Sequence, residues 1–178
     1  MMNVRVGQLG LHDTHFVNPH GLDVDGHYSS AYDLASLAWY ALHLPAFNQI
    51  VSQVTHVAPG HSLLNTNELL TRYDGADGIK TGLTDNAGLC LVGSATRDGR
   101  RLISVVLNAP RWYADTEAIL DYGYAKLAFE TDGAGAEALS GSQRGAGTGL
   151  VGQAGDGEAP AMPALPPGPQ AGGRRAPP

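Results

Sequence analysis

The segment from Leu89 to Leu107 reads LCLVGSATRDGRRLISVVL, with two apolar runs of strand length on either side of Asp98-Gly99. An Asp-Gly pair between two such runs is a strong signal for a tight β-hairpin. Both runs are nearly continuous in apolar residues instead of alternating with polar ones, which is typical of strands covered on both faces. The segment therefore predicts an antiparallel hairpin in a sheet with helices on its two sides.

The sequence just before and after this hairpin supplies two more elements. Residues 76–81 form a third run of strand length, and residues 112–129 have the periodicity of a helix that could cover one face of the sheet. The apolar side of that helix is expected to contain Ala118, Ile119, Tyr122 and Leu127.

Residues 30–43 carry the clearest helical pattern, with Ser30 and Asp33 spaced as a capping box and Pro45 as the stop signal. A short helix near Phe47 and a turn near residues 67–70 are expected to follow. Before them, residues 11–28 are rich in turn signals and predict a structured loop. Helices, an antiparallel meander and a final helix define an α+β (mixed α/β) fold, an antiparallel sheet flanked by helices.

The composition changes after Thr131, and this change sets the expected domain boundary. Residues 132–178 contain 12 Gly and 7 Pro but no aromatic residue, so they have little with which to build a core. We therefore expect one folded domain over residues 1–131, followed by a Gly/Pro-rich disordered tail over residues 132–178.

The charge and the remaining composition exclude several classes of protein. The net charge is −6, and residues 1–131 hold 13 acidic against 8 basic residues, which argues against nucleic acid or an anionic membrane as partner. Cys90 is the only cysteine, so no internal disulfide can form, and we expect it to be a small buried residue in its strand. The first residues have no apolar core of a signal peptide, and no stretch has the length of a membrane span, so membrane attachment is not encoded here.

Four histidines lie close together with three aspartates in the expected loop, which raises the question of a metal site. They are His12, His15, His20 and His27, with Asp13, Asp23 and Asp25. Their spacing matches no helix-based histidine pair and no calcium loop, so we expect no metal.

The residues Lys80-Thr81-Gly82, within the segment DGIKTGLT from Asp77 to Thr84, carry the chemistry of the chain. The ammonium group of Lys80 attracts an anionic substrate end, the hydroxyl of Thr81 can donate to a carboxylate, and Gly82 lets another backbone approach. An edge strand at this place could pair with an extended peptide. Taken alone, the tripeptide is also typical of a strand that ends in a solvated turn.

Six ordered blocks along residues 3–129 give the tripeptide a context. They are Leu9-Gly10 with THFVNPHGL (residues 14–22), GHYSSAYDLA (26–35), NTNELL (65–70), GIKTGLT with Ala87-Gly88 (78–88), LISVVL (102–107) and DYGY (121–124). In this order they resemble the D-alanyl-D-alanine carboxypeptidases, low-molecular-weight penicillin-binding proteins that are serine peptidases. The resemblance implies an incomplete β-lactamase/transpeptidase-like fold, because only the C-terminal part of the catalytic domain is matched.

The resemblance also implies an activity. Such enzymes attack the terminal D-Ala-D-Ala bond of peptidoglycan stem peptides with a serine, form an acyl-enzyme, and are acylated by β-lactams at the same serine. By resemblance, Lys80, Thr81 and Gly82 belong to the substrate-binding site, and Arg111 is the nearest candidate for an arginine that binds the substrate carboxylate in some relatives. By resemblance, no metal or other cofactor is implied, and the implied location is extracytoplasmic, on the periplasmic or cell-wall side of the membrane.

The chain departs from the family pattern in one respect. The nucleophile motif Ser-x-x-Lys is absent, since Lys80 and Lys126 are preceded at that spacing by Asp77 and Gly123, and no Ser-x-Asn occurs. No catalytic residue is therefore expected in this chain, which we interpret as a partial chain that is inactive and poorly folded alone. Two alternatives remain, a related serine β-lactamase and a noncatalytic remnant that binds cell-wall peptide.

Overall fold

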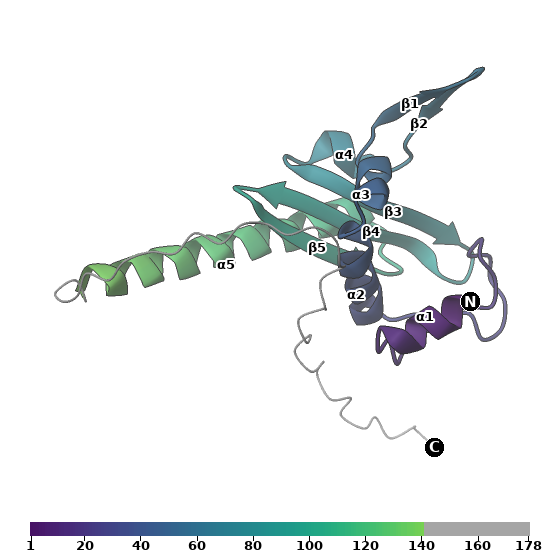
Figure 1. Cartoon of the computed structure of the whole chain (residues 1–178), viewed down its shortest axis with the longest axis horizontal. Coiled ribbons are helices and arrows are strands. Elements are labelled where there is room, and N and C mark those ends of the chain that lie inside the picture. Colours follow the sequence, from purple (N-terminus) through teal and green to yellow (C-terminus); the bar gives the residue numbers. More distant parts are fainter. Residues whose placement is uncertain (141–178) are drawn as a thin grey trace, which may run out of the picture.

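The computed structural model describes residues 1–140, with side chains through Phe129, and its centre is a three-stranded antiparallel sheet. Strands β3 (Ala76–Thr84), β4 (Gly88–Arg97) and β5 (Arg100–Val106) lie in the order β3-β4-β5 (Figure 1). Asp98 and Gly99 form the β4–β5 turn with φ angles of 50° and 72°, the positive values that a two-residue hairpin turn requires. The predicted hairpin and the third strand are confirmed.

Helices cover both faces of this sheet, which confirms the predicted α+β fold. On one face, α5 (Trp112–Ser140) and the short α4 (Leu69–Arg72) pack on the strands. The buried residues of that layer are Leu69, Tyr73, Leu91, Ala95, Val106, Tyr113 and Leu120. On the other face, α2 (Ala31–Leu42) and α3 (Pro45–Val51) enclose a smaller cluster. Its buried members are Ala38, Leu42 and Ile79.

Two tyrosines fasten α4 and α5 to the sheet. Tyr73 donates a hydrogen bond of 2.7 Å to the Asp121 carboxylate, and Tyr124 donates one of 2.6 Å to the carbonyl oxygen of Ala95. The Arg97 guanidinium lies 4.4 Å and 4.7 Å from the centres of the two rings. Burial, together with the bond to Asp121, raises the pKa of Tyr73 well above its ordinary value, and burial also raises the pKa of Tyr124. Both hydroxyls therefore remain protonated donors at neutral pH.

Helix α5 differs from the sequence-based expectation in two ways. Ala118, Ile119 and Tyr122 face solvent, while Leu120 and the small Thr116 are buried against the sheet, so the expected apolar side was wrong. The fit is close at Gly123, where an added Cβ would lie 2.7 Å from the side chain of Leu102. The helix also continues to Ser140, beyond the boundary expected at Thr131, with Ala134, Ala136 and Ala138 favouring helix and Gly133 and Gly135 opposing it. Residues 141–178 of the expected tail lie outside the described residues.

The beginning of the chain forms α1 (Met2–Gln8), which ends before Gly10 at a φ of 67°, and then the predicted loop. Ser30 caps α2 by accepting a hydrogen bond of 3.2 Å from the Asp33 amide. Asp33 does more than complete a cap. Its buried carboxylate accepts hydrogen bonds from the Asp13 amide at 2.8 Å and the Thr14 hydroxyl at 2.7 Å, and so holds the loop against α2.

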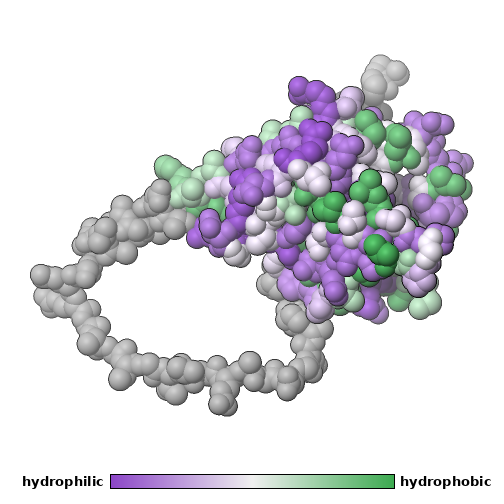
Figure 2. Space-filling model, turned by 90° about the horizontal axis from the view of Figure 1, so that it is seen from above, coloured by the Kyte–Doolittle hydropathy of each residue, from purple (hydrophilic) through white to green (hydrophobic). Residues whose placement is uncertain are grey.

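A second hairpin was not predicted from the sequence. Strands β1 (Thr55–Ala58) and β2 (His61–Leu64) pair antiparallel around Pro59-Gly60 and project from the rest of the molecule (Figure 1). Alternating short runs around Pro-Gly were the available signal, but the runs are only four residues long. Several of its apolar side chains are exposed, Val57 and Leu64 among them, and Figure 2 shows apolar residues scattered among polar ones on one face of the molecule.

No helix in residues 1–140 is both long enough and apolar enough to span a membrane.

The tight fit between β4 and the α4–α5 layer gives a first testable prediction. At Gly93 an added Cβ would lie 2.8 Å from Thr116, 2.9 Å from Leu69 and 3.1 Å from Ser104. Gly93→Ala is therefore expected to lower the free energy of unfolding by about 1–3 kcal/mol, as measured by urea denaturation. Gly82→Ala on the neighbouring strand is the control, because the Cβ there would meet only Cys90 at an ordinary 3.9 Å. Equal stability of the two variants would contradict this description of the core.

Candidate ligand-binding strand

Strand β3, which carries Lys80-Thr81-Gly82, lies at an edge of the sheet. It pairs with β4 from Ala76 to Thr84, and in the described part of the chain its other edge pairs with no strand. Ile79 is buried in the α2–α3 cluster, whereas Lys80 and Gly82 are exposed and Thr81 is half-buried. The strand thus begins in the core and becomes accessible at the tripeptide.

The ammonium group and the hydroxyl of the tripeptide come from opposite faces of this strand. Lys80 pairs with Val92, which packs in the α2–α3 cluster, and the Lys80 ammonium donates to the carbonyl oxygen of Thr81. Thr81 pairs with the fully buried Leu91 on the α4–α5 side. The Thr81 hydroxyl lies 3.2 Å from that of Thr66. A ligand along the edge could therefore meet a cation on one side and a hydroxyl on the other.

Gly82 has no structural need to be glycine within this chain. Its φ is not in the left-handed region, and a Cβ at this position would make only an ordinary contact with Cys90. The space beside it is open to an external group. Cys90 itself is half-buried, not buried as expected, because it faces this accessible part of β3.

The first residues of β3 are held by a network of charged and hydroxyl groups around Asp77. Its carboxylate accepts hydrogen bonds of 2.6 Å from Ser94 and from Thr96, and it pairs with Arg101 at 2.8 Å. Arg101 also donates to Asn48 of α3 at 3.2 Å. The network joins β3, β4, β5 and α3 just before the tripeptide, and sequence reasoning missed this role of Asp77.

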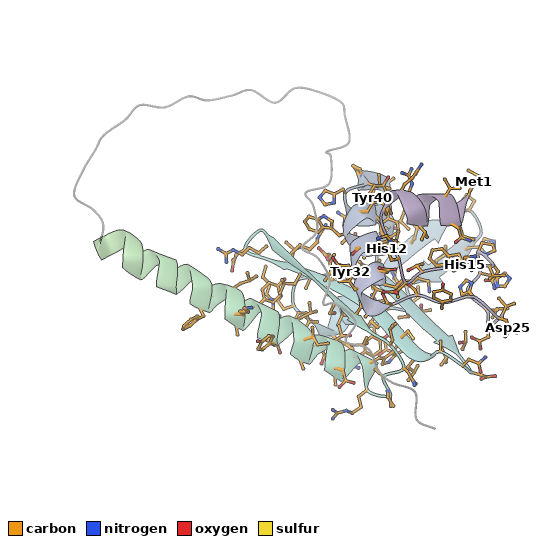
Figure 3. The ribbon with its side chains drawn as sticks, turned by 90° about the horizontal axis from the view of Figure 1, so that it is seen from below. Met1, His12, His15, Asp25, Tyr32 and Tyr40 are labelled. Atoms are coloured by element: carbon orange, nitrogen blue, oxygen red, sulfur yellow. The ribbon has the colours of Figure 1, made fainter. Side chains whose placement is uncertain are left out.

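The far end of β3 is held by the loop that follows α1. Asp23 accepts a hydrogen bond of 2.7 Å from the Thr84 hydroxyl and one of 3.1 Å from the Asn86 amide. The Thr84 hydroxyl in turn accepts one of 3.0 Å from the Ala87 amide. Figure 3 shows Asp25 of this loop beside the end of the sheet where β3 turns into β4. The sequence reasoning also missed this role of Asp23, which it considered only for a metal site that it did not expect.

Arg111, the fourth expected site residue, lies just before α5 and is exposed. Its guanidinium pairs with Asp115 one turn along, at 3.4 Å. Lys80, Thr81 and Gly82 thus lie together on β3, whereas Arg111 is paired with Asp115 of α5.

The histidine-rich loop is held by its own hydrogen bonds. His15 is bonded to the carbonyl oxygen of Gly26 at 2.7 Å, and His27 accepts a hydrogen bond from the Val17 amide at 3.1 Å. Among the described residues no three His, Cys, Asp or Glu side chains are grouped so that they could hold a metal ion.

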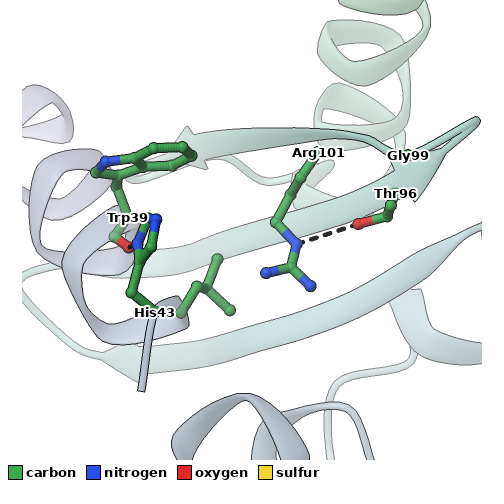
Figure 4. Close-up of a pocket in the computed structure, with 6 residues that line it drawn as sticks. Trp39, His43, Thr96, Gly99 and Arg101 are labelled. Atoms are coloured by element: carbon green, nitrogen blue, oxygen red, sulfur yellow. Dashed lines mark hydrogen bonds between the residues drawn. The ribbon is translucent and has the colours of Figure 1, made fainter. Parts of the chain in front are cut away.

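A pocket of about 310 Å³ lies near the β4–β5 turn, at the end of the sheet opposite to the Lys80-Thr81-Gly82 tripeptide (Figure 4). It is lined by Trp39, Leu42, His43, Thr96, Gly99 and Arg101. Arg101 there donates to Thr96 at 3.1 Å and belongs to the Asp77 network. The pocket is therefore separate from the tripeptide, since Gly82 pairs with Cys90 near the other end of β4.

The arrangement of strands and helices is that of DD-peptidase domains. The Streptomyces K15 DD-transpeptidase superposes with a TM-score of 0.63 and 35% sequence identity, covering 70% of this chain and 52% of that chain. A D-alanyl-D-alanine carboxypeptidase from Mycobacterium tuberculosis H37Rv superposes with a TM-score of 0.64 and 34% identity over similar shares. These matches confirm the expected transpeptidase-like fold.

Sequence comparisons give the same result. A family model described as D-alanyl-D-alanine carboxypeptidase (peptidase S11) matches residues 1–111. D-alanyl-D-alanine carboxypeptidase DacA of Escherichia coli K12 is 40% identical over 131 residues, and DacF of Bacillus subtilis is 36% identical over 133 residues. The chain therefore belongs to the D-alanyl-D-alanine carboxypeptidase family, as the six blocks predicted. These two matches include 70% of this chain but only 32% and 34% of the two relatives' own length.

Proposed function

We propose that the chain is the C-terminal portion of the catalytic domain of a serine-type D-Ala-D-Ala carboxypeptidase. The substrate would be the stem peptide of peptidoglycan, and β-lactams would acylate the same serine. The observation that carries the proposal is the accessible edge of β3, with Lys80 exposed and an unobstructed Gly82. Membership of the family supports the same assignment.

In this proposal the residues of β3 bind and orient the peptide. The substrate lies extended along the edge and forms backbone hydrogen bonds with β3, as peptides do when they extend a sheet. The Thr81 hydroxyl donates to its terminal carboxylate, and the positive charge of Lys80 stabilises negative charge at the reacting end. Gly82 lets the two backbones approach closely. Arg111 is a further candidate to bind the carboxylate, and in the structure its guanidinium pairs with Asp115.

The attacking serine would come from polypeptide outside this sequence, because no serine here precedes a lysine at the Ser-x-x-Lys spacing. The folded portion would include residues 1–131 and the end of α5 through Ser140, with the Gly/Pro-rich remainder as a tail, and the whole enzyme would act outside the cytoplasmic membrane. A related serine β-lactamase is the second candidate, because the Lys-Thr-Gly strand is common to both classes. A noncatalytic remnant that binds cell-wall peptide is the third.

Labelling with a fluorescent penicillin tests the proposal. The 178-residue chain is expected to remain unlabelled, because it has no activated serine to acylate. A version extended upstream in its gene through an in-frame Ser-x-x-Lys is expected to become covalently labelled, and its Ser→Ala variant is the control. A long-lived adduct supports the carboxypeptidase, whereas rapid release of hydrolysed penicillin supports a β-lactamase. Covalent labelling of the 178-residue chain itself would contradict the proposal.

A further inference from the structure

The contacts of Asp23 join two segments that are more than sixty residues apart in the sequence. One carboxylate oxygen accepts from the Thr84 hydroxyl at 2.7 Å, and the other accepts from the Asn86 amide at 3.1 Å. Thr84 is the last residue of β3, two positions after Gly82. The two bonds thus fix the turn in which the accessible part of β3 ends.

The loop is rigid enough to transmit this restraint. Before Asp23, the Asn18 side chain accepts from the Gly21 amide at 2.7 Å and donates to the Leu22 carbonyl oxygen at 2.8 Å. The ends of the loop are joined by backbone hydrogen bonds of 2.9 Å and 3.0 Å between His15 and Tyr28. Asp33 on α2 holds the start of the loop through Asp13 and Thr14. These hydrogen bonds fix the position of the loop that carries Asp23.

The two ends of β3 are restrained by different carboxylates. Asp77 holds the buried beginning through Arg101, and Asp23 holds the exposed end through Thr84. Between these anchors, Lys80, Thr81 and Gly82 pair with β4 on one edge only. An edge strand with one free end would fray, and fraying would disturb the extended backbone that a peptide needs for pairing.

We propose that Asp23 is a positioning residue for the ligand-binding strand. Through Thr84 and Asn86 it keeps the Thr81–Gly82 backbone extended and ready to pair with a peptide. The inference rests on the proposed function for its ligand, a peptide that ends in D-Ala-D-Ala. Asp23 touches no ligand in this account and acts only through the turn.

The test uses the version extended upstream through Ser-x-x-Lys, with its Ser→Ala change so that the peptide is not consumed, labelled with ¹⁵N; this protein is the wild type for the variants below. Asp23→Asn keeps the size of the side chain but leaves one acceptor oxygen for two donors. Asp25→Asn is the matched control, since it removes the same charge from an exposed position in the same loop. Thr84→Val is a second variant, which removes the hydroxyl that Asp23 holds. Near-ultraviolet circular dichroism establishes that each variant is folded.

Hydrogen exchange is measured first. Asp23→Asn and Thr84→Val are expected to speed exchange about tenfold or more at the Ala87 amide and at the β3 amides from Thr81 to Thr84 that bond to β4, because charge-assisted hydrogen bonds are lost. Asp25→Asn is expected to leave these rates unchanged. Unchanged rates in folded Asp23→Asn would overturn the proposal.

Titration with N-acetyl-Lys-D-Ala-D-Ala then tests the effect on the ligand. In the wild type the peptide is expected to shift the amide signals of Lys80 to Gly82, and in Asp23→Asn the Kd is expected to rise about threefold to tenfold. Faster exchange with an unchanged Kd would overturn the proposal, because Asp23 would then be only structural. Absence of binding to the wild type would contradict the proposed function itself. It would also contradict the positioning role, which depends on that ligand.

Discussion

Replacing Asp77 by alanine is expected to lower the free energy of unfolding by about 3 kcal/mol, a large part of the stability of a small domain. The Asp77 and Arg101 side chains are only 18% and 27% exposed, so loss of the carboxylate leaves the Arg101 cation poorly solvated and unpaired. The Ser94 and Thr96 hydroxyls lose their acceptor as well. Urea denaturation measures the change.

Asp74→Ala is the control for this variant. Asp74 lies three residues earlier, is almost fully exposed, and pairs with Arg97 at 3.9 Å. Its replacement is expected to change the stability by less than about 1 kcal/mol, as for other surface ion pairs. If the two variants unfold at the same urea concentration as the wild type, the Asp77 network does not hold the sheet together.

Lys80→Ala is expected to slow acylation by penicillin about 100-fold or more in the version extended through Ser-x-x-Lys, without unfolding it. The exposed side chain contributes little to packing, so its loss removes mainly a positive charge from the reacting end of the ligand. The second-order rate constant of fluorescent penicillin labelling gives the effect. Thr81→Val is expected to act in the same direction, because it removes the hydroxyl proposed to bind the carboxylate.

Lys126→Ala provides the matched comparison. Lys126 is the other lysine of the chain and lies exposed on α5. Its loss is expected to leave the labelling rate within about twofold of the wild type, since an exposed charge far from the site is screened by salt. An equal effect of the two lysine variants would show that net charge, not the position of Lys80, sets the rate.

The layered fold could be predicted because its signals are local. The Asp98-Gly99 turn specifies the β4–β5 hairpin, and the spacing of Ser30 from the apolar stripe specifies where α2 begins. Continuous apolar runs in β4 and β5 required cover on both faces, which α2 and α5 provide.

The sequence-based prediction of the buried side of α5 was wrong because tertiary packing decides which side of that helix faces the sheet. Along α5 the apolar side chains Ile119 and Tyr122 suggested the buried side, but Thr116, Leu120 and Tyr124 face the sheet, and Gly123 lets the helix approach Leu102 of β5 closely. Hydrophobic periodicity does not show this close approach.

Part of the candidate site was also open to prediction. Lys80-Thr81-Gly82 is a contiguous motif, so its presence on a strand could be read directly. The roles of Asp23 and Asp77 depend on partners 61 and 24 residues away, and no local pattern marks such contacts. Asp23 follows the turn at Gly21, and Asp77 lies at the start of β3. Aspartate is common in turns and at the ends of strands, so its presence there does not by itself indicate a further role.

The most direct measurement is a crystal structure of the version extended through Ser-x-x-Lys, with its Ser→Ala change, bound to N-acetyl-Lys-D-Ala-D-Ala. The peptide is expected to lie extended along the outer edge of β3, with its carboxylate at Thr81 and its backbone paired beside Gly82. A peptide found instead along β5 or in the pocket beside Arg101, with the edge of β3 empty, would contradict the assignment of Lys80-Thr81-Gly82 as the strand that holds the substrate.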